Sequence, residues 1–195
     1  MLIEAGEACS EQKLSEDQEL TVCQYLDHLD IASPCSREPV TLCESISGDG
    51  EILPPMIILP GVLHLEQWYR SSTGLEDNDL VGVSETGYSN DELSLGWHRH
   101  FERFSARRQL GTYRLLLLDG YGSHCTEEFI EFCDDHKIIL FCLPPHTTHL
   151  FQPLDVVVFQ PYKHHHAEAV GVATRTGCSD FNKVEFLVAI HSIRR

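Results

Sequence analysis

The chain has 195 residues, the size of one domain of ordinary length. A hydrophobic fraction of 42% is sufficient for a packed core and excludes a chain that is disordered throughout. Lys and Arg total 14 against 30 Asp and Glu, and this net charge of −16 excludes a protein that grips nucleic acid through a broad basic face.

The first predicted element is a helix over residues 14–29. Ser15 can cap this helix, and acidic residues follow in its first turn, where the helix dipole favours them. Leu20, Cys23 and Leu26 then recur at helical spacing. Prolines after this segment break regular structure before the next element begins.

The remainder of the chain predicts strands and helices that alternate. Residues 48–50, with the sequence GDG, are typical of a hairpin turn between two strands. We expect strands at 40–47, 52–59, 80–84, 113–118 and 137–143. We expect helices from a capping box at 89–92 to about residue 104, at 126–136, and from about residue 155, the last kinked by Pro161. This order is that of a mixed α/β layer fold.

Two aspartates follow buried strands in this scheme. Asp119 comes directly after the apolar run YRLLLL, and Asp155 follows the next long strand by a short loop. Carboxylates at the ends of neighbouring strands can converge, and their hard oxygens suit Mg²⁺ or Mn²⁺. Two such ions can promote hydrolysis of a phosphodiester. The alternative is structural, with an Asp-Gly turn at 119 and a helix cap at 155.

Several longer motifs identify a family. The segments LLLLDGYGSH and LPPHTTHLFQPLDVVVFQPYKH resemble the catalytic domain of the pogo/Tigger/jerky group of transposases. This is the DDE superfamily endonuclease domain, which is shared with transposon-derived centromere protein B. REPVTLCESISGDGEILPPMIIL, VSETGYSNDELSLGWHRHFERF and CTEEFIEFCDDHKIILFCL continue the match in the same order. The resemblance covers about residues 33–166 and is closest to fungal elements.

This resemblance implies an α/β fold with an RNase H-like mixed sheet flanked by helices. It also implies an Asp-Asp-Asp triad that binds two Mg²⁺ or Mn²⁺ ions, in which Asp119 and Asp155 match the second and third acids as catalytic and metal-binding residues. The implied chemistry is hydrolysis of DNA that frees a 3′-hydroxyl, followed by strand transfer. DNA is then the expected partner and the nucleus the expected location, and a homo-oligomer is compatible with this role.

The sequence departs from the family pattern at the first acid. In the family this Asp lies in a motif of the form Asn-x-Asp-Glu on the first strand, and no such motif occurs here. Asp30, Glu44 and Asp49 are available acids outside any matching motif. We therefore expect a truncated domain that lacks its first, central strand and is catalytically impaired. The expected division is an acidic segment with a helix-turn-helix remnant at 1–32, the endonuclease domain at 33–166 and a helical tail at 167–195.

Basic and imidazole side chains near the motifs are candidates for contact with the DNA backbone. His124, His146 and His149 flank the two aspartates, and Lys163 precedes three consecutive histidines. Their alternative roles are to cap loops and to form a solvated helix face. Arginines 99, 103, 107 and 108 form a local stripe that could hold a phosphate, although the net charge favours a solvated surface.

Three other functions remain open beside the impaired endonuclease. The first is an active Mg²⁺- or Mn²⁺-dependent strand-transfer enzyme with an unidentified third acid, and the second is a non-enzymatic remnant without DNA binding. The third is a zinc-binding protein, although eight cysteines without a CxxC pair favour reduced, buried thiols. No stretch approaches the roughly 18 apolar residues of a membrane span, and the polar start is no signal peptide. We expect a soluble, intracellular protein without a membrane partner.

Overall fold

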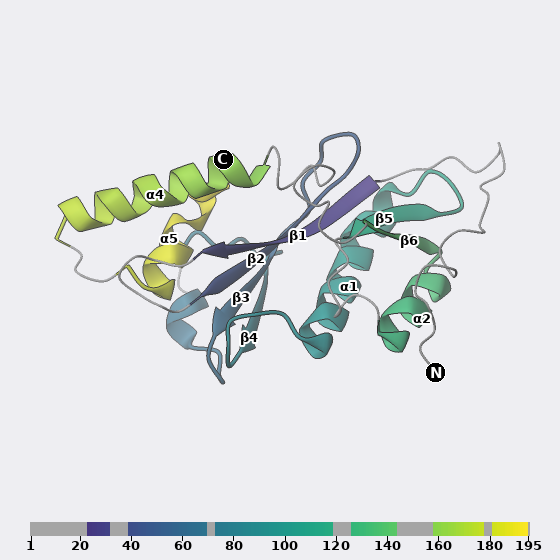
Figure 1. Cartoon of the computed structure of the whole chain (residues 1–195), viewed down its shortest axis with the longest axis horizontal. Helices are drawn as coiled ribbons and strands as arrows, with labels where there is room; N and C mark the ends of the chain where they lie inside the picture. The colour runs from purple at the N-terminus through teal and green to yellow at the C-terminus, as the bar shows by residue number, and fades with distance from the viewer. Residues whose placement is uncertain are drawn as a thin grey trace.

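The fold is a six-stranded mixed sheet with helices on both faces, as the computed structural model in Figure 1 shows. The structure describes residues 23–31 by their backbone, and residues 39–69, 73–118, 126–143, 158–177 and 181–194. The strands are β1 (Cys23–Ile31), β2 (Val40–Ile46), β3 (Met56–Pro60), β4 (Leu80–Ser84), β5 (Arg114–Leu118) and β6 (Ile138–Cys142). The helices are α1 (Asp91–Ser105), α2 (Glu127–Asp135), α4 (Phe159–Arg175) and α5 (Lys183–Ile193), with short 3₁₀ turns η1 (Glu66–Tyr69) and η2 (Ala106–Arg108).

Strand β1 occupies the centre of the sheet, whose order is β4-β3-β2-β1-β5-β6. It pairs antiparallel with β2 from Tyr25 to Ile31 and parallel with β5 from Cys23 to Leu26. This corrects two expectations: a strand stands where the first, central strand was expected to be missing, and residues 23–29 are not helical. Backbone hydrogen bonds to two neighbours outweigh the helical spacing of Leu20, Cys23 and Leu26, because propensity yields to tertiary pairing.

The apolar faces of the sheet are covered by two separate helical layers (Figure 1). One core forms where Leu42, Ile57 and Leu59 pack against α4 and α5. The second core forms where Ile58 and Leu116 pack against α1 and α2. Because successive side chains of a strand point to opposite faces, β2 and β3 contribute to both cores.

Most of the remaining predicted elements agree with the structure. Strand 80–84 matches β4 and 113–118 matches β5. The helix expected to open at the 89–92 capping box and to end near 104 matches α1, and the helix expected at 126–136 matches α2 within a residue. Asn90 and Thr126 cap these two helices through hydrogen bonds to the amides of Leu93 and Phe129. The expectation of a mixed α/β fold is confirmed.

The C-terminal helices differ in detail from the sequence expectation. Pro161 is the third residue of α4, where a missing amide proton removes no intrahelical hydrogen bond, so the reason to expect a kink does not apply. Helix α4 runs through the expected boundary at residue 166, and α5 contributes Leu187 and Ile190 to the core. The division into 1–32, 33–166 and 167–195 stays a prediction. In the described part of the chain, no helix is long and apolar enough to cross a membrane.

Substitution of Gly87 by Ala is expected to destabilise the fold by several kcal/mol. Gly87 has φ of +77°, and a Cβ atom there would lie 2.3 Å from the carbonyl oxygen of Pro39. Gly50 is the matched control, because its φ is +89° but a Cβ atom meets nothing within 4 Å. Gly50→Ala should therefore lower the free energy of unfolding by only roughly 1–2 kcal/mol, the strain of a left-handed backbone at a residue with a Cβ atom. Equal shifts of the urea midpoint in the two variants would contradict this packing argument.

Candidate functional site

The candidate site lies where β1 and β5 run side by side. In their parallel register Leu26 pairs with Leu118, which is the last residue of β5. Asp27 is the next residue of β1, and Asp119 is the next residue of the chain. The central strand therefore brings an acidic residue to the end of the strand that precedes the predicted second acid.

Asp27 is a candidate that the sequence did not reveal. The helical interpretation of residues 14–29 assigned it to a helix, and the Asn-x-Asp-Glu motif that marks the first acid is absent. Asp30 was the acid of this segment considered as a replacement, and it pairs with Thr41, beyond the residues of β1 that pair with β5. One signal in the sequence could have predicted a strand here. The segment contains aromatic and aliphatic residues and precedes a hairpin, and both features are typical of a strand.

The predicted site residues are distributed unevenly over the described structure. Asp119, Asp155, His124, His146 and His149 lie outside the described residues, so their roles stay predictions. Lys163 is exposed on α4. Within the described residues, no group of three or more His, Cys, Asp and Glu side chains is arranged to hold a metal ion.

Glu44 on β2 is an acid held by an arginine rather than left available as a ligand. Its position pairs with Asp27 in the antiparallel register, and its side chain is 0% exposed. Arg194 donates from Nε to Oε1 at 2.6 Å and from Nη2 to Oε2 at 3.2 Å. Burial raises the pKa of Glu44, and the positive charge of Arg194 opposes that rise. The side chain therefore serves as half of a buried ion pair.

The surroundings of this ion pair connect the sheet to both C-terminal helices. Arg194 follows α5 directly and also donates to the carbonyl oxygen of Leu53 at 3.4 Å. Tyr162 of α4 is buried beside the pair, and this burial raises its pKa. Charge neutralisation in the core beside β1 thus depends on a residue 150 positions from Glu44 in the chain.

A second buried polar cluster lies between α1 and α2. The Nε2 atom of His98 lies 3.4 Å from Sγ of Cys133, and the imidazole ring packs against Phe129 and Phe132. Burial raises the pKa of Cys133 to about 12, so this thiol is no nucleophile near neutral pH. Cys43 is also buried, whereas Cys142 is exposed, so the expectation of buried thiols holds for two of these three described cysteines.

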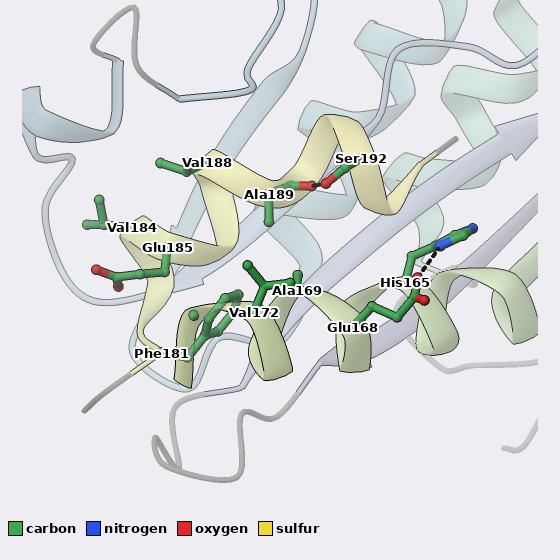
Figure 2. Close-up of a pocket in the computed structure, with 11 residues that line it drawn as sticks. His165, Glu168, Ala169, Val172, Phe181, Val184, Glu185, Val188, Ala189 and Ser192 are labelled. Carbon is green, nitrogen blue, oxygen red and sulfur yellow. Dashed lines mark hydrogen bonds and ion pairs between the residues drawn. The ribbon is translucent and has the colours of Figure 1, made fainter. Parts of the chain in front are cut away.

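The three histidines after Lys163 have structural contacts of their own. His164 and His165 lie 3.6 and 3.2 Å from the carboxylate of Glu168. Burial lowers the pKa of His166, whose ring packs near Phe181 and Phe186. Figure 2 shows His165 and Glu168 at one end of a groove between α4 and α5, which has a volume of about 530 Å³ and mainly Ala and Val walls. Contact between Lys163 and DNA stays a prediction.

Comparison with known proteins places these features in a family. The sequence model described as DDE superfamily endonuclease matches residues 36–194. A protein of Cochliobolus lunatus called "MFS-type transporter clz9" is 31% identical over 156 residues, which cover 80% of this chain and 17% of that protein. The human "Pogo transposable element with ZNF domain" is 26% identical over 121 residues, which cover 61% of this chain and 8% of that protein.

The fold has a counterpart among solved structures. The Mos1 transposase catalytic domain, solved with raltegravir and Mg, aligns with a TM-score of 0.50 over 90% of this chain and 80% of that domain. At 13% identity this similarity concerns the fold alone, and it confirms the expected RNase H-like architecture. The chain spans less than a fifth of the length of either protein matched by sequence. From the family match over residues 36–194, the chain belongs to the DDE superfamily endonucleases, as a domain of the transposase type.

Proposed function

We propose that this domain is a metal-dependent DNA endonuclease centre of the transposase type, with Asp27, Asp119 and Asp155 as its three acids. The observation that carries the proposal is the register of β1 against β5, in which Leu26 pairs with Leu118. If that register continues by one residue, Asp27 and Asp119 become neighbours. Impairment was expected because the first acid of the triad was missing together with its strand. Strand β1 supplies a central strand, and Asp27 is the residue that we propose as the first acid.

The donor chemistry of these residues fits Mg²⁺ or Mn²⁺. Three aspartates offer hard, anionic oxygens, which are the ligands that these ions prefer. A bound pair of such ions would supply an activated water or 3′-hydroxyl and would stabilise the leaving oxygen of a phosphodiester. The Mos1 domain, solved with Mg, supports the same choice of ion for this fold.

The other residues of the chain have supporting roles in this proposal. Arg194 neutralises Glu44, so that a fourth acid beside β1 adds no free negative charge to a site that must accept a polyanion. His124, His146, His149 and Lys163 are proposed contacts to the DNA backbone. A DNA substrate implies action in the nucleus, which we propose as the location.

A non-catalytic remnant of a transposase is the second candidate function. It is favoured by the sequence of β1, CQYLDHLDI, which lacks the Asn-x-Asp-Glu motif of an intact first strand. If such a protein lost its activity before its fold, the sheet would keep its strand order while the family motif disappeared. Such a protein binds no metal at Asp119 and Asp155.

Nicking of supercoiled plasmid separates the two candidates. We expect the purified protein to nick DNA in Mn²⁺ or Mg²⁺ but not in EDTA. Asp119→Asn and Asp155→Asn should each lower the rate at least about a hundredfold, because each removes a ligand worth several kcal/mol of transition-state stabilisation. Asp135→Asn, an exposed acid at the end of α2, is the control and should nick normally. A folded protein that nicks with neither ion would establish the non-catalytic candidate.

A further inference from the structure

One line of arginines on α1 and the turn that follows it has no acidic partner in the part of the chain that the structure describes. Arg99, Arg103 and Arg107 recur every four residues, so they lie on one side of this helical segment. All three are exposed. Among the described residues, none of the three forms an ion pair, and Arg103 lies over the ring of Phe104, with 5.3 Å to its centroid. We call these three residues the arginine stripe.

Other arginines close to the stripe do have acidic partners. Arg108, the next residue in the chain, pairs with Asp49 and Glu51 at 2.5 and 3.2 Å. Glu102 lies within the same turn as the stripe, but its carboxylate pairs with the buried Arg114 at 2.5 Å. The carboxylates of Asp49, Glu51 and Glu102 are therefore engaged with other arginines.

Such a stripe is unusual in a chain of this charge. Only 14 Lys and Arg residues stand against 30 acids. Even so, three exposed arginines between residues 99 and 107 form no ion pair with another described residue. Like charges at four-residue spacing destabilise a helix by a few tenths of a kcal/mol per pair. The negative charges of a bound polyanion would offset this repulsion. Binding of a polyanion therefore accounts for the stripe, whereas the stability of the fold does not.

We propose that the arginine stripe binds the phosphate backbone of a DNA duplex. The planar guanidinium group forms bidentate hydrogen bonds with phosphate, which favours arginine over lysine at such contacts. Eight residues of helix extend roughly 12 Å, which matches three to four nucleotides at about 3.4 Å per nucleotide of one strand. The stripe thus fits successive phosphates along one strand.

The Arg107 end of the stripe lies apart from the proposed catalytic centre. Helix α1 packs on the sheet face that also carries α2, whereas α4 covers the opposite face (Figure 1). Arg114, the first residue of β5, donates to Ser105 at the end of α1 at 2.6 Å, so Arg107 lies at the opposite end of β5 from Leu118. The Arg107 end of the stripe therefore binds DNA away from the bond that is cut, and this assignment rests on the proposed function.

The neighbouring helix limits how much DNA this surface can hold. The exposed side of α2 carries Glu127, Glu128, Glu131, Asp134 and Asp135. These acids repel phosphate and confine the contact to the line of the stripe. We expect a narrow contact with one backbone strand, consistent with a chain whose net charge excludes a broad basic face.

Salt-dependent binding tests the assignment without cleavage. The affinity for a fluorescent 30-base-pair duplex is measured by anisotropy in EDTA, between 50 and 200 mM KCl. Substitution of all three stripe residues by Gln should reduce the slope of log K against log salt by about 2.7, or 0.9 for each lost phosphate contact. The affinity at 100 mM salt should fall on the order of a hundredfold. The triple Lys variant keeps the charge and should keep the slope.

Two single variants separate the effect of the position of an arginine from the effect of losing one positive charge. Arg103 and Arg175 are both exposed helical arginines, but Arg175 ends α4 on the other layer. Arg103→Gln should lower the slope by about 0.9, and Arg175→Gln should leave it unchanged. Equal slopes for the two variants, or a triple Gln variant that binds as the wild type does, would overturn the proposal. Tighter stripe-dependent binding of RNA than of the duplex would overturn the choice of DNA.

The outcome stays separable from that of the proposed function. Asp119→Asn should bind the duplex with the full slope while it loses nicking. A wild-type protein that never nicks but shows stripe-dependent binding would refute the catalytic proposal and support the stripe. If the triple Gln variant nicked normally and bound DNA as the wild type does, the result would support the catalytic proposal and refute the stripe.

Discussion

Asp27→Asn is expected to lower metal-dependent plasmid nicking at least about a thousandfold, the effect of removing several kcal/mol of transition-state stabilisation. The register of β1 is the reason, because Leu26 pairs with Leu118 and Asp27 follows directly. The measurement is the initial rate of nicking in Mn²⁺, compared with the thermal unfolding midpoint of the same variant. A carboxamide replaces the carboxylate without a change of volume, so the midpoint should move little.

Asp30→Asn provides the matched control for this variant. Asp30 lies on the same strand, three residues or roughly 10 Å further along, and pairs with Thr41 of β2. Its substitution should retain most of the nicking rate. If Asp30→Asn abolished nicking while Asp27→Asn did not, Asp30 would be the first acid. If both variants nicked normally, neither residue would belong to the site.

Arg194→Met is expected to lower the free energy of unfolding by about 3–5 kcal/mol at pH 7, because it leaves Glu44 as an uncompensated buried charge. This is a large fraction of the roughly 5–15 kcal/mol that stabilises a domain. Urea unfolding followed by circular dichroism measures the loss. Arg175→Met removes an exposed arginine and should change stability by less than about 0.5 kcal/mol.

The destabilisation by Arg194→Met should depend on pH. Burial already raises the pKa of Glu44 above its ordinary value of 4.5, and loss of Arg194 removes the attraction that opposes this rise. A carboxyl group with a raised pKa favours the folded state fully below its unfolded pKa and loses that contribution as the pH rises through its folded pKa. The deficit relative to the wild type should therefore be small near pH 4 and grow toward pH 7.

A double variant tests whether the charge of Glu44 is the cause. Glu44→Gln combined with Arg194→Met removes both charges, and it should recover a substantial part of the stability lost by Arg194→Met alone. Its deficit should also lose most of its pH dependence between pH 4 and 7. A double variant as unstable as Arg194→Met at pH 7 would show that packing of the Arg194 side chain dominates.

The sequence by itself determined most of the layer fold. Strand 80–84 and the apolar run before Asp119 were predicted closely because β-branched or continuous apolar residues and turn signals mark them locally. The helices at α1 and α2 were predicted because a capping residue precedes an amphipathic segment in each case. The motifs around Asp119 and Asp155 likewise identified the family, which the match over residues 36–194 confirms.

Only the tertiary structure decided the state of residues 23–31. The spacing of Leu20, Cys23 and Leu26 indicated a helix, but hydrogen bonds from β2 and β5 on either side make this segment the central strand. Local propensity is weaker than such pairing, so the position of Asp27 could not be derived from the segment alone. The same holds for Glu44 and Arg194, which meet across 150 positions because burial of a charge requires a partner that only the fold can bring near.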